Sequence, residues 1–352
     1  MSKTNEKAPE NLTSIAEVED AKLAATTEQS KSQSRIVLER FLRHKPAMVS
    51  AVILVLVTLL AFTSIGFGPI PGWWKQSYLD AGSVVNGGKP TFSLLPTWLG
   101  GSGIAWGDHP FGQDSVGKDY FALVMNGTQK SIIIGVVVGL VGTFLGAVIG
   151  AVAGYFRGWV DEVLMRITDL FIVIPLLVLA AVLGQIAGRG STSIIALAVV
   201  LGLVTWTGLA RLVRGEILSL REREYVSAAQ AMGSRTSRVI FKHLLPNTIG
   251  VIVVNATFAI AGAILLESSL SFLGFGVQQP ESSLGLLISQ YQNAFLTRPW
   301  LFWWPGMTIV VIALAVNFLG DGLRDAFDPR QTGKRRRRRA GLFAMPTRKE
   351  KP

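Results

Sequence analysis

The segment from Gly112 to Asp119, Gly-Gln-Asp-Ser-Val-Gly-Lys-Asp, is similar in spacing to a loop that binds nucleotide phosphates. Such a loop places a Ser or Thr after its lysine, because that hydroxyl binds Mg²⁺. Asp119 occupies this position, and Gly-Asp-His-Pro-Phe precedes the segment where a phosphate loop needs an apolar strand. We therefore expect no ATP to bind here. Two roles remain for these glycines and carboxylates, a turn or a ligand contact, and we favour the turn.

The other reactive residues of the chain do not indicate a metal site or an enzyme active site. The chain has no cysteine, which excludes disulfides and thiolate ligands. The histidines, His44, His109 and His243, fall on different predicted loops. An intramembrane enzyme would need a convergent nucleophile and base or a set of metal ligands. We therefore predict no catalytic residues, no metal ligands and no cofactor in this chain.

Glu267 is an acidic residue inside a long apolar stretch, where ionisable groups are usually functional. At about 1.5 Å per residue, the roughly 20 residues from Asn247 place it about 30 Å along a helix, near the far membrane interface. With Ser268 it is a candidate for an external gate or a helix end. A structural hydrogen-bonding role is the interpretation that we favour. Because almost no other charge lies in the apolar stretches, a secondary transporter or channel has little support.

Residues 224–247 form a polar segment with several alanines between two apolar stretches. Ala228 and Ala229 are strong helix formers with small side chains, so a partner surface can approach their backbone closely. A polar segment kept out of the bilayer in this way indicates a docking element, although an ordinary loop is the alternative.

Three further residues predict how this segment folds. Gly233 can supply the positive φ that ends a short helix. Ser234 can cap a second helix, and Pro246 is expected to stop it. The pattern predicts a helix, a sharp turn and a second helix.

This segment resembles the EAA loop of ABC importer permeases. The pattern of that loop is Glu-Ala-Ala, three residues, Gly, nine residues, Ile, one residue and Leu-Pro. Ser227 replaces the acidic residue here and His243 replaces the isoleucine. The positions that match are Ala228, Ala229, Gly233, Leu245 and Pro246.

The longer match, from Tyr225 through Asn247, is similar to the C-type permease subunit of the dipeptide and oligopeptide branch, and the resemblance covers roughly residues 35–330. It implies a type I importer fold in a bacterial plasma membrane. It also implies a second permease subunit, two ATPase subunits that bind ATP and Mg, and an extracytoplasmic substrate-binding protein. Peptides are the implied substrate, with nickel complexes or other small solutes as the alternative. The implied ATPase-coupling residues are Tyr225, Ser227, Ala228, Ala229, Met232, Gly233, Leu245 and Pro246.

A second stretch also resembles this branch of permeases, in the external loop before the second predicted span. Its residues are His109, Pro110, Gly112, Asp114, Gly117 and Asp119. The stretch from Glu267 to Gly274 likewise resembles the family.

The elements that must position these residues are membrane helices. The chain has 352 residues, of which 49% are hydrophobic and 16% charged, which is too apolar for a typical soluble domain. About 20 apolar residues cross a bilayer as a helix. We predict an all-α polytopic membrane protein with six spans, near 47–66, 131–154, 168–187, 192–212, 248–270 and 301–320. The first span begins too late for a cleaved signal and is expected to stay as an anchor.

Lys and Arg residues predict the orientation of these spans, because they are enriched on the cytoplasmic side of short loops. They concentrate before the first span, between the second and third, between the fourth and fifth, and after the sixth. Both termini and residues 224–247 are therefore expected in the cytoplasm, and the loop before the second span outside.

Glycines recur at every fourth position in the second span: Gly142, Gly146, Gly150 and Gly154. This spacing aligns them on one helix face and permits close packing. A sliding surface for alternating access is one interpretation, and static packing is the one that we favour. Pro175 in the third span and Gly202 in the fourth are expected to bend their helices.

The predicted organisation has a permease domain at 35–330 between two polar ends. It includes an external loop at 67–130 and a coupling loop at 213–247. Residues 1–34 are interpreted as a disordered cytoplasmic leader. Residues 331–352 form a disordered basic tail, and much of the net charge of +11 lies there. Anionic lipid headgroups are the expected partner of that tail, and no nucleic acid is expected.

Overall fold

The computed structural model describes residues 33–93, 103, 106–186, 193–279 and 281–328. They belong to two compact units, one made of residues 45–324 and the other of the two chain ends. The predicted leader and basic tail lie outside the described residues, apart from a few residues of the leader's end. In the end unit, helix α2 (Gln33–Arg43) carries Arg40, whose Nη1 donates a hydrogen bond to the carbonyl oxygen of Asp328 at 3.2 Å.

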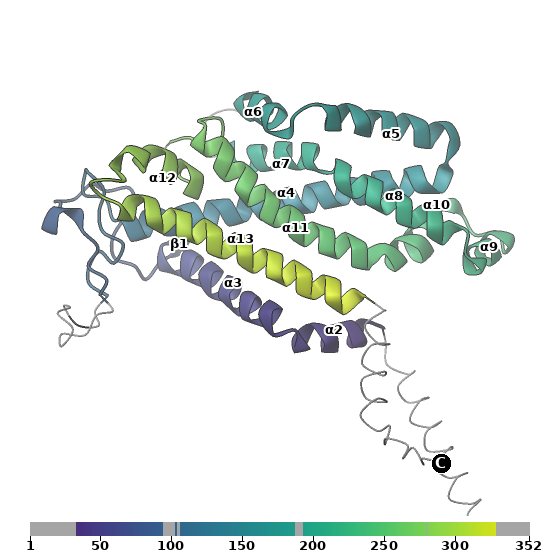
Figure 1. The fold of residues 1–352 in the computed structure, drawn as a ribbon, viewed down its shortest axis with the longest axis horizontal. Coiled ribbons are helices and arrows are strands. Elements are labelled where there is room, and N and C mark those ends of the chain that lie inside the picture. Colours follow the sequence, from purple (N-terminus) through teal and green to yellow (C-terminus); the bar gives the residue numbers. More distant parts are fainter. Residues whose placement is uncertain (1–32, 94–102, 104–105, 187–192, 280, 329–352) are drawn as a thin grey trace, which may run out of the picture. The chain divides into compact units, whose positions relative to one another are not determined.

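The larger unit is built from helices (Figure 1). Those long and apolar enough to cross a membrane singly are α3 (Lys45–Ser64), α4 (Tyr120–Phe156), the continuous helix Thr236–Phe272 and α13 (Trp300–Phe327). Two further pairs of helices are each bent at a short break. If each pair crosses the membrane as one span, the described residues contain six spans instead of four. The two pairs are α5 (Gly158–Val173) with α6 (Leu176–Ile186), and α7 (Ser193–Thr205) with α8 (Thr207–Arg221). The prediction of an all-α polytopic membrane protein is confirmed.

Shorter elements lie between these helices. The segment Thr236–Phe272 consists of α10 (Thr236–Arg238), the π-helical turn η3 (Val239–Leu244) and α11 (Leu245–Phe272). Helix α9 (Glu224–Ala231) precedes it, and α12 (Leu284–Tyr291) and the 3-10 turn η4 (Gln292–Ala294) follow it. The first loop holds the 3-10 turn η1 (Asn86–Gly88) and the only sheet of the described residues, β1 (Gly66–Phe67) antiparallel to β2 (Ile70–Pro71).

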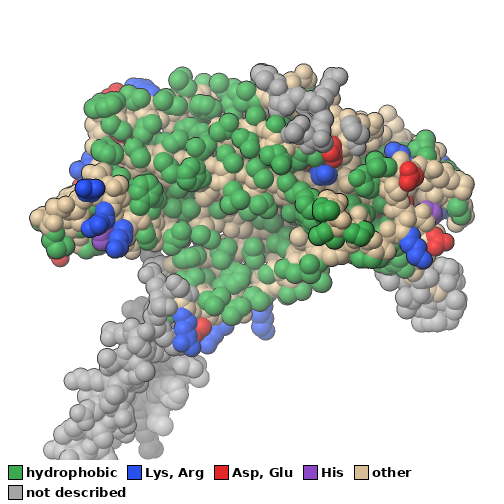
Figure 2. Space-filling model, turned by 180° about the vertical axis from the view of Figure 1, so that it is seen from behind, with side chains coloured by type: hydrophobic (Ala, Val, Ile, Leu, Met, Phe, Trp, Pro, Cys, Tyr) green, Lys and Arg blue, Asp and Glu red, His purple; other side chains and the backbone are tan. Residues whose placement is uncertain are grey.

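The outer surface of the helices is apolar. Figure 2 shows hydrophobic side chains over a broad face of the helical unit, with most charged side chains toward its ends. Large apolar side chains whose exposure to water is unfavourable, such as Leu140, Phe144 and Val173, lie on the surface of α4 and α5. A soluble protein rarely exposes such a continuous patch, so this surface fits contact with lipid.

Helix α4 is the centre of the unit and contacts α3, α7, α8 and α11. Its glycines explain how these helices approach so closely. A Cβ atom at Gly142, Gly146, Gly150 or Gly154 would lie 2.4 to 2.9 Å from atoms of α7 and α8. A Cβ at Gly135 would lie 2.7 Å from Ile264 of α11. The glycines therefore serve close packing in this structure.

The two expected helix bends have different outcomes. Pro175 lies directly after a break at Ile174, and α5 and α6 meet there at 87°. Gly202 does not bend its helix, because α7 and α8 meet at Trp206, at 44°. A Cβ at Gly202 would lie 2.6 Å from Cβ of Val141, so this glycine serves helix packing instead.

Candidate functional site

Residues 224–247 fold into a helical hairpin, named here the α9–η3 hairpin. Its first arm, α9, ends in a Schellman motif at Gly233, which has φ of 77°. The amide of Ser234 donates to the carbonyl of Ala229 at 3.1 Å, and the amide of Gly233 to that of Gln230 at 2.9 Å. These are the two hydrogen bonds of that motif. The predicted turn at Gly233 is confirmed.

The second arm differs from the prediction in two ways. Ser234 does not cap it, because Arg235 is the N-cap residue and makes no side-chain capping bond. Pro246 does not stop it, because it lies in the first turn of α11, in a helix continuous from Thr236 to Phe272. The π-helical turn η3 comes just before this proline. In a π turn each carbonyl accepts from the amide five residues on, as that of Ile240 does from Leu245, so the hydrogen-bond register changes directly before the proline.

Apolar side chains fix the hairpin to the helical unit. Val226 of α9 and three residues of η3, Val239, Ile240 and Leu244, are buried in one cluster with Ala151 of α4. The same cluster includes residues of α8 and α11: Leu209, Val213, Ile217 and Ile252. The hairpin is therefore packed closely against α4, α8 and α11.

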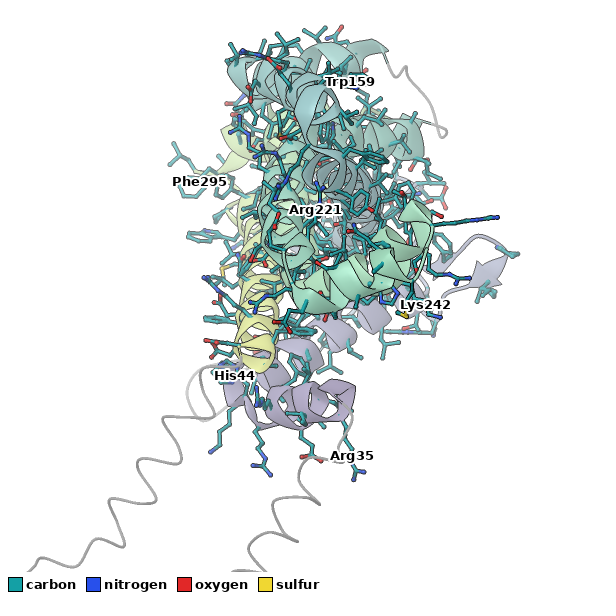
Figure 3. The ribbon with its side chains drawn as sticks, turned by 90° about the vertical axis from the view of Figure 1, so that its right-hand side faces the viewer. Arg35, His44, Trp159, Arg221, Lys242 and Phe295 are labelled. Atoms are coloured by element: carbon teal, nitrogen blue, oxygen red, sulfur yellow. The ribbon has the colours of Figure 1, made fainter. Side chains whose placement is uncertain are left out.

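Polar contacts add to this attachment at Tyr155, near the end of α4. Nη1 of Arg221 donates to the Tyr155 carbonyl oxygen at 2.5 Å, and the guanidinium lies 5.4 Å from the centre of the Tyr155 ring. Nε2 of Gln230 donates to the Tyr155 hydroxyl oxygen at 3.2 Å. Figure 3 faces this end of the unit and labels Arg221 on α8 and Lys242 on η3.

The hairpin has an inner and an outer side. Ala229 is 3% exposed and faces inward with Val226, since residues three apart share a face of a helix. The side chain of Ala229 is therefore covered by residues of this chain, and of the two alanines only Ala228 presents its side chain to a partner. The outer side holds Tyr225, Ser227, Ala228, Met232 and Gly233, with the Met232 side chain 80% exposed.

An apolar groove lies beside the hairpin, next to two other predicted coupling residues. It has a volume of about 430 Å³, and Pro246 is exposed and Leu245 half-buried in its lining. Phe241 also lines the groove and is exposed, and the sequence alone did not lead us to predict a role for it. The spacing of Phe241, Leu245 and Ile249, four residues apart, is the signal that could have revealed this face. The remaining lining residues are Phe144, Ala147, Val148 and Ile252.

The predicted 109–119 residues meet at the opposite end of the unit, where Asp119 organises the start of α4. Its carboxylate accepts from the amide of Ala122 at 2.8 Å and from Nε1 of Trp74 at 3.0 Å. Nδ1 of His109 lies 2.7 Å from the same carboxylate. Asp119 is an N-cap, and these contacts also tie the loop to the residues after α3.

Asp114 fixes the rest of this loop. Its Oδ1 accepts from the amides of Val116 and Lys118 at 2.9 and 2.8 Å, and its Oδ2 accepts from the Tyr291 hydroxyl at 2.9 Å. Burial, together with the Asp114 charge, raises the pKa of Tyr291, so this hydroxyl remains a donor. Gly117 has φ of 81° and lies against Gly82, whose carbonyl oxygen would be 2.0 Å from a Cβ.

The two other predicted residues of this loop lie in the same turn. Pro110 is buried, and Gly112 has φ of 85°. The amide of Gly112 donates to the His109 carbonyl at 2.9 Å, and the Gly112 carbonyl accepts from Tyr120 at 3.0 Å. The carboxylates of Asp114 and Asp119 both accept hydrogen bonds from other groups of this chain. These contacts fit a structural turn.

Glu267 is fully buried in α11, near the same end as α12. Its Oε2 accepts from the hydroxyl of Ser131 on α4 at 3.1 Å, and its Oε1 from that of Ser271 at 2.7 Å. The Ser283 hydroxyl donates to that of Ser271 at 3.2 Å, which carries the chain of contacts to the start of α12. Glu267 thus joins three helices through hydrogen bonds.

Ser268 lies beside this chain of contacts, in a groove of about 360 Å³ between α11 and α12. Its buried hydroxyl has no hydrogen-bond partner among the described residues. Within those residues, no group of three or more His, Cys, Asp or Glu could hold a metal ion.

Comparisons with known proteins agree with this arrangement. The model of the family "Binding-protein-dependent transport system inner membrane component" matches residues 146–333, and that of the "N-terminal TM domain of oligopeptide transport permease C" matches residues 32–77. The oligopeptide transport system permease protein OppC of Mycobacterium tuberculosis is 36% identical over 305 residues, 87% of this chain and 97% of the relative. OppC of Bacillus subtilis is 33% identical over 322 residues, 92% of this chain and 98% of the relative.

The first family model alone spans more than half of the chain, including α8, the α9–η3 hairpin and α11. This chain therefore belongs to the family of inner membrane components of binding-protein-dependent transport systems.

Proposed function

We propose that this chain is a permease subunit of an ATP-driven importer of peptides. It forms the substrate path with a second permease subunit. Two ATPase subunits dock on the α9–η3 hairpin and supply the free energy of ATP hydrolysis, with their own ATP and Mg. An extracytoplasmic binding protein delivers the substrate to the other end of the unit.

One observation carries this proposal: the hairpin is exposed on one side and rigidly packed on the other. Its outer side presents small or flexible side chains, Ser227, Ala228 and Met232, to which another surface can fit closely. Its inner side is buried against α4 and α8. A docked subunit can therefore push on transmembrane helices without deforming the hairpin.

The orientation follows from this role and from the distribution of basic residues. ATP is available in the cytoplasm, so the hairpin end faces the cytoplasm, and both chain ends lie on that side. The 109–119 loop and α12 then face the outside. Their buried hydrogen bonds make a firm surface for the binding protein.

The peptide substrate is supported by the relatives, which are named as oligopeptide permeases. These names favour peptides over nickel complexes. A structural role of Glu267, the acid buried in α11, is supported by the serine hydroxyls that donate to both of its carboxylate oxygens.

The test is a bulky substitution on the outer side of the hairpin. Ala228→Trp leaves buried packing untouched, so we expect normal membrane insertion and normal pairing with the second permease. It should obstruct the ATPases, since a clash of this kind costs about 1–3 kcal/mol. Pull-down of the ATPases and peptide uptake are measured in the same membranes.

Two control variants isolate this effect. Ala228→Ser keeps the side chain small and should preserve both readouts. Leu296→Trp places the same indole side chain at an exposed position after α12 and should leave the ATPases bound. Normal ATPase recovery and normal uptake in Ala228→Trp would refute the docking role of the hairpin.

A further inference from the structure

Two helix breaks lie side by side in the larger unit. The break between α5 and α6 is at Ile174, whose extended backbone (φ −77°, ψ 126°) is the conformation favoured before a proline. The break between α7 and α8 is at Trp206. The ring of Phe171, one turn before the first break, contacts the ring of Trp206 edge to face at 5.8 Å. The two bends therefore lie next to each other in the fold.

On the hairpin side of the breaks, ion pairs join α5 to α8. Nε and Nη2 of Arg214 donate to the two carboxylate oxygens of Asp161 at 2.5 and 2.6 Å. Arg211 donates to Asp169. These contacts run in antiparallel order along the two helices. The first is bidentate and half-buried, which is the geometry that makes such pairs strong and directional.

Helix α5 buries little apolar surface on this side, although it also packs against α4, and Arg157 at its start pairs with Glu222 at the end of α8 at 2.5 Å. Thr168 is the only buried residue of this helix. Its apolar side chains Trp159, Leu170 and Val173 are exposed, and Trp159 projects outward in Figure 3. Because α5 buries so few side chains, its ion pairs with α8 contribute strongly to its position relative to that helix.

On the other side of the breaks, α6 and α7 are joined by apolar packing. Ala180 and Ala181 of α6 lie in one buried cluster with Leu197 and Leu201 of α7. Residues of α8 belong to a different buried cluster, the one that holds the α9–η3 hairpin. The breaks thus lie between two buried clusters, and α4 and α11 contribute residues to both of them.

We infer that Asp161, Asp169, Arg211 and Arg214 are positioning residues for coupling, which make α5 and α8 move as one body with the α9–η3 hairpin. This body pivots on α6 and α7 at the Phe171–Trp206 contact. A push on the hairpin reaches α8 directly and reaches α5 through the ion pairs. This inference rests on the proposed function, because the push comes from the docked ATPases.

Exchange of charges tests the positioning role. Arg214→Asp should retain ATPase binding and ATP hydrolysis but lose peptide uptake, since the hairpin is intact while α5 no longer follows α8. The double variant Asp161→Arg with Arg214→Asp should recover uptake. Unchanged uptake in the single variant, or no recovery in a double variant that still binds ATPases, would overturn the inference.

Distances between spin labels test the motion itself, and the absence of native cysteine makes the labelling clean. One pair, Leu170→Cys with Leu212→Cys, joins exposed positions on α5 and α8, and the other, Val182→Cys with Leu212→Cys, joins α6 and α8. Between the nucleotide-free and ATP-trapped complexes, the α5–α8 distance should stay constant and the α6–α8 distance should shift. An α5–α8 distance that changes as much, or an α6–α8 distance that stays constant, would contradict the inference.

Peptide uptake by the same labelled complexes separates this failure from failure of the proposed function. If uptake depends on ATP while the α6–α8 distance stays constant, the hinge is wrong and the importer role stands. If the ATPases neither bind nor drive uptake, the importer role fails, and the hinge inference fails with it.

Discussion

At the scale of single residues, the lack of room for a Cβ atom explains why glycine occupies several positions in the helices. Gly150 is placed where α4 meets α8, and a Cβ there would lie 2.4 Å from the carbonyl oxygen of Ala210. A backbone atom cannot move aside as a flexible side chain can. Gly262 on α11 has no atom within 4 Å of its Cβ position, so the same residue type has no packing role there.

This difference predicts opposite outcomes for one substitution. Gly150→Ala should lower the free energy of unfolding by about 1–3 kcal/mol, because the helices must separate to fit the methyl group. Gly262→Ala should be neutral, or stabilising by up to about 1 kcal/mol, since alanine favours a helix. Thermal unfolding of the purified variants in one detergent measures both. Equal melting temperatures would show that α4 and α8 do not need this close contact.

At the scale of elements, the α9–η3 hairpin depends on a turn that only some residues can adopt. Gly233 has φ of 77° and open space around its Cβ position, so its constraint is the backbone conformation alone. Asparagine tolerates positive φ, whereas a β-branched residue opposes it. The hairpin is therefore sensitive to the shape of the side chain and not to its volume.

Two variants at this position test the turn. Gly233→Asn should retain ATPase binding and peptide uptake. Gly233→Val should insert and pair with the second permease but lose ATPase binding, because the two arms no longer meet at the same angle. Pull-down of the ATPases from membranes with matched permease content is the measurement. Equal recovery of the ATPases in both variants would show that the turn conformation does not govern docking.

At the scale of the whole molecule, local signals predicted the helices and the turn at Gly233. Contacts between distant residues could not be predicted in this way. Asp119 meets Trp74 from 45 positions away, and Asp114 meets Tyr291 from 177 positions away. No periodicity encodes such pairs. The inward face of Ala229 was missed for a related reason, because the polar α9 has only 8 residues and no clear apolar stripe.

The effects of proline and glycine on the helices were also only partly predictable from the sequence. Pro175 bends its helix because the proline itself lacks an amide hydrogen. The effect of Gly202 was set by Val141 on a neighbouring helix, and Pro246 lies in a continuous helix whose hydrogen-bond register changes at the π-helical turn before it. A residue whose effect depends on its tertiary neighbours cannot be interpreted from its own sequence context.

Peptide uptake into liposomes tests the importer function most directly. The chain is reconstituted with its second permease and the two ATPases, with ATP enclosed on the hairpin side and the binding protein and a labelled oligopeptide on the other. We predict accumulation that requires ATP, the ATPases and the binding protein together, and that is lost in Ala228→Trp. Accumulation by the two permeases without ATPases, driven by an ion gradient alone, would contradict an ATP-driven importer.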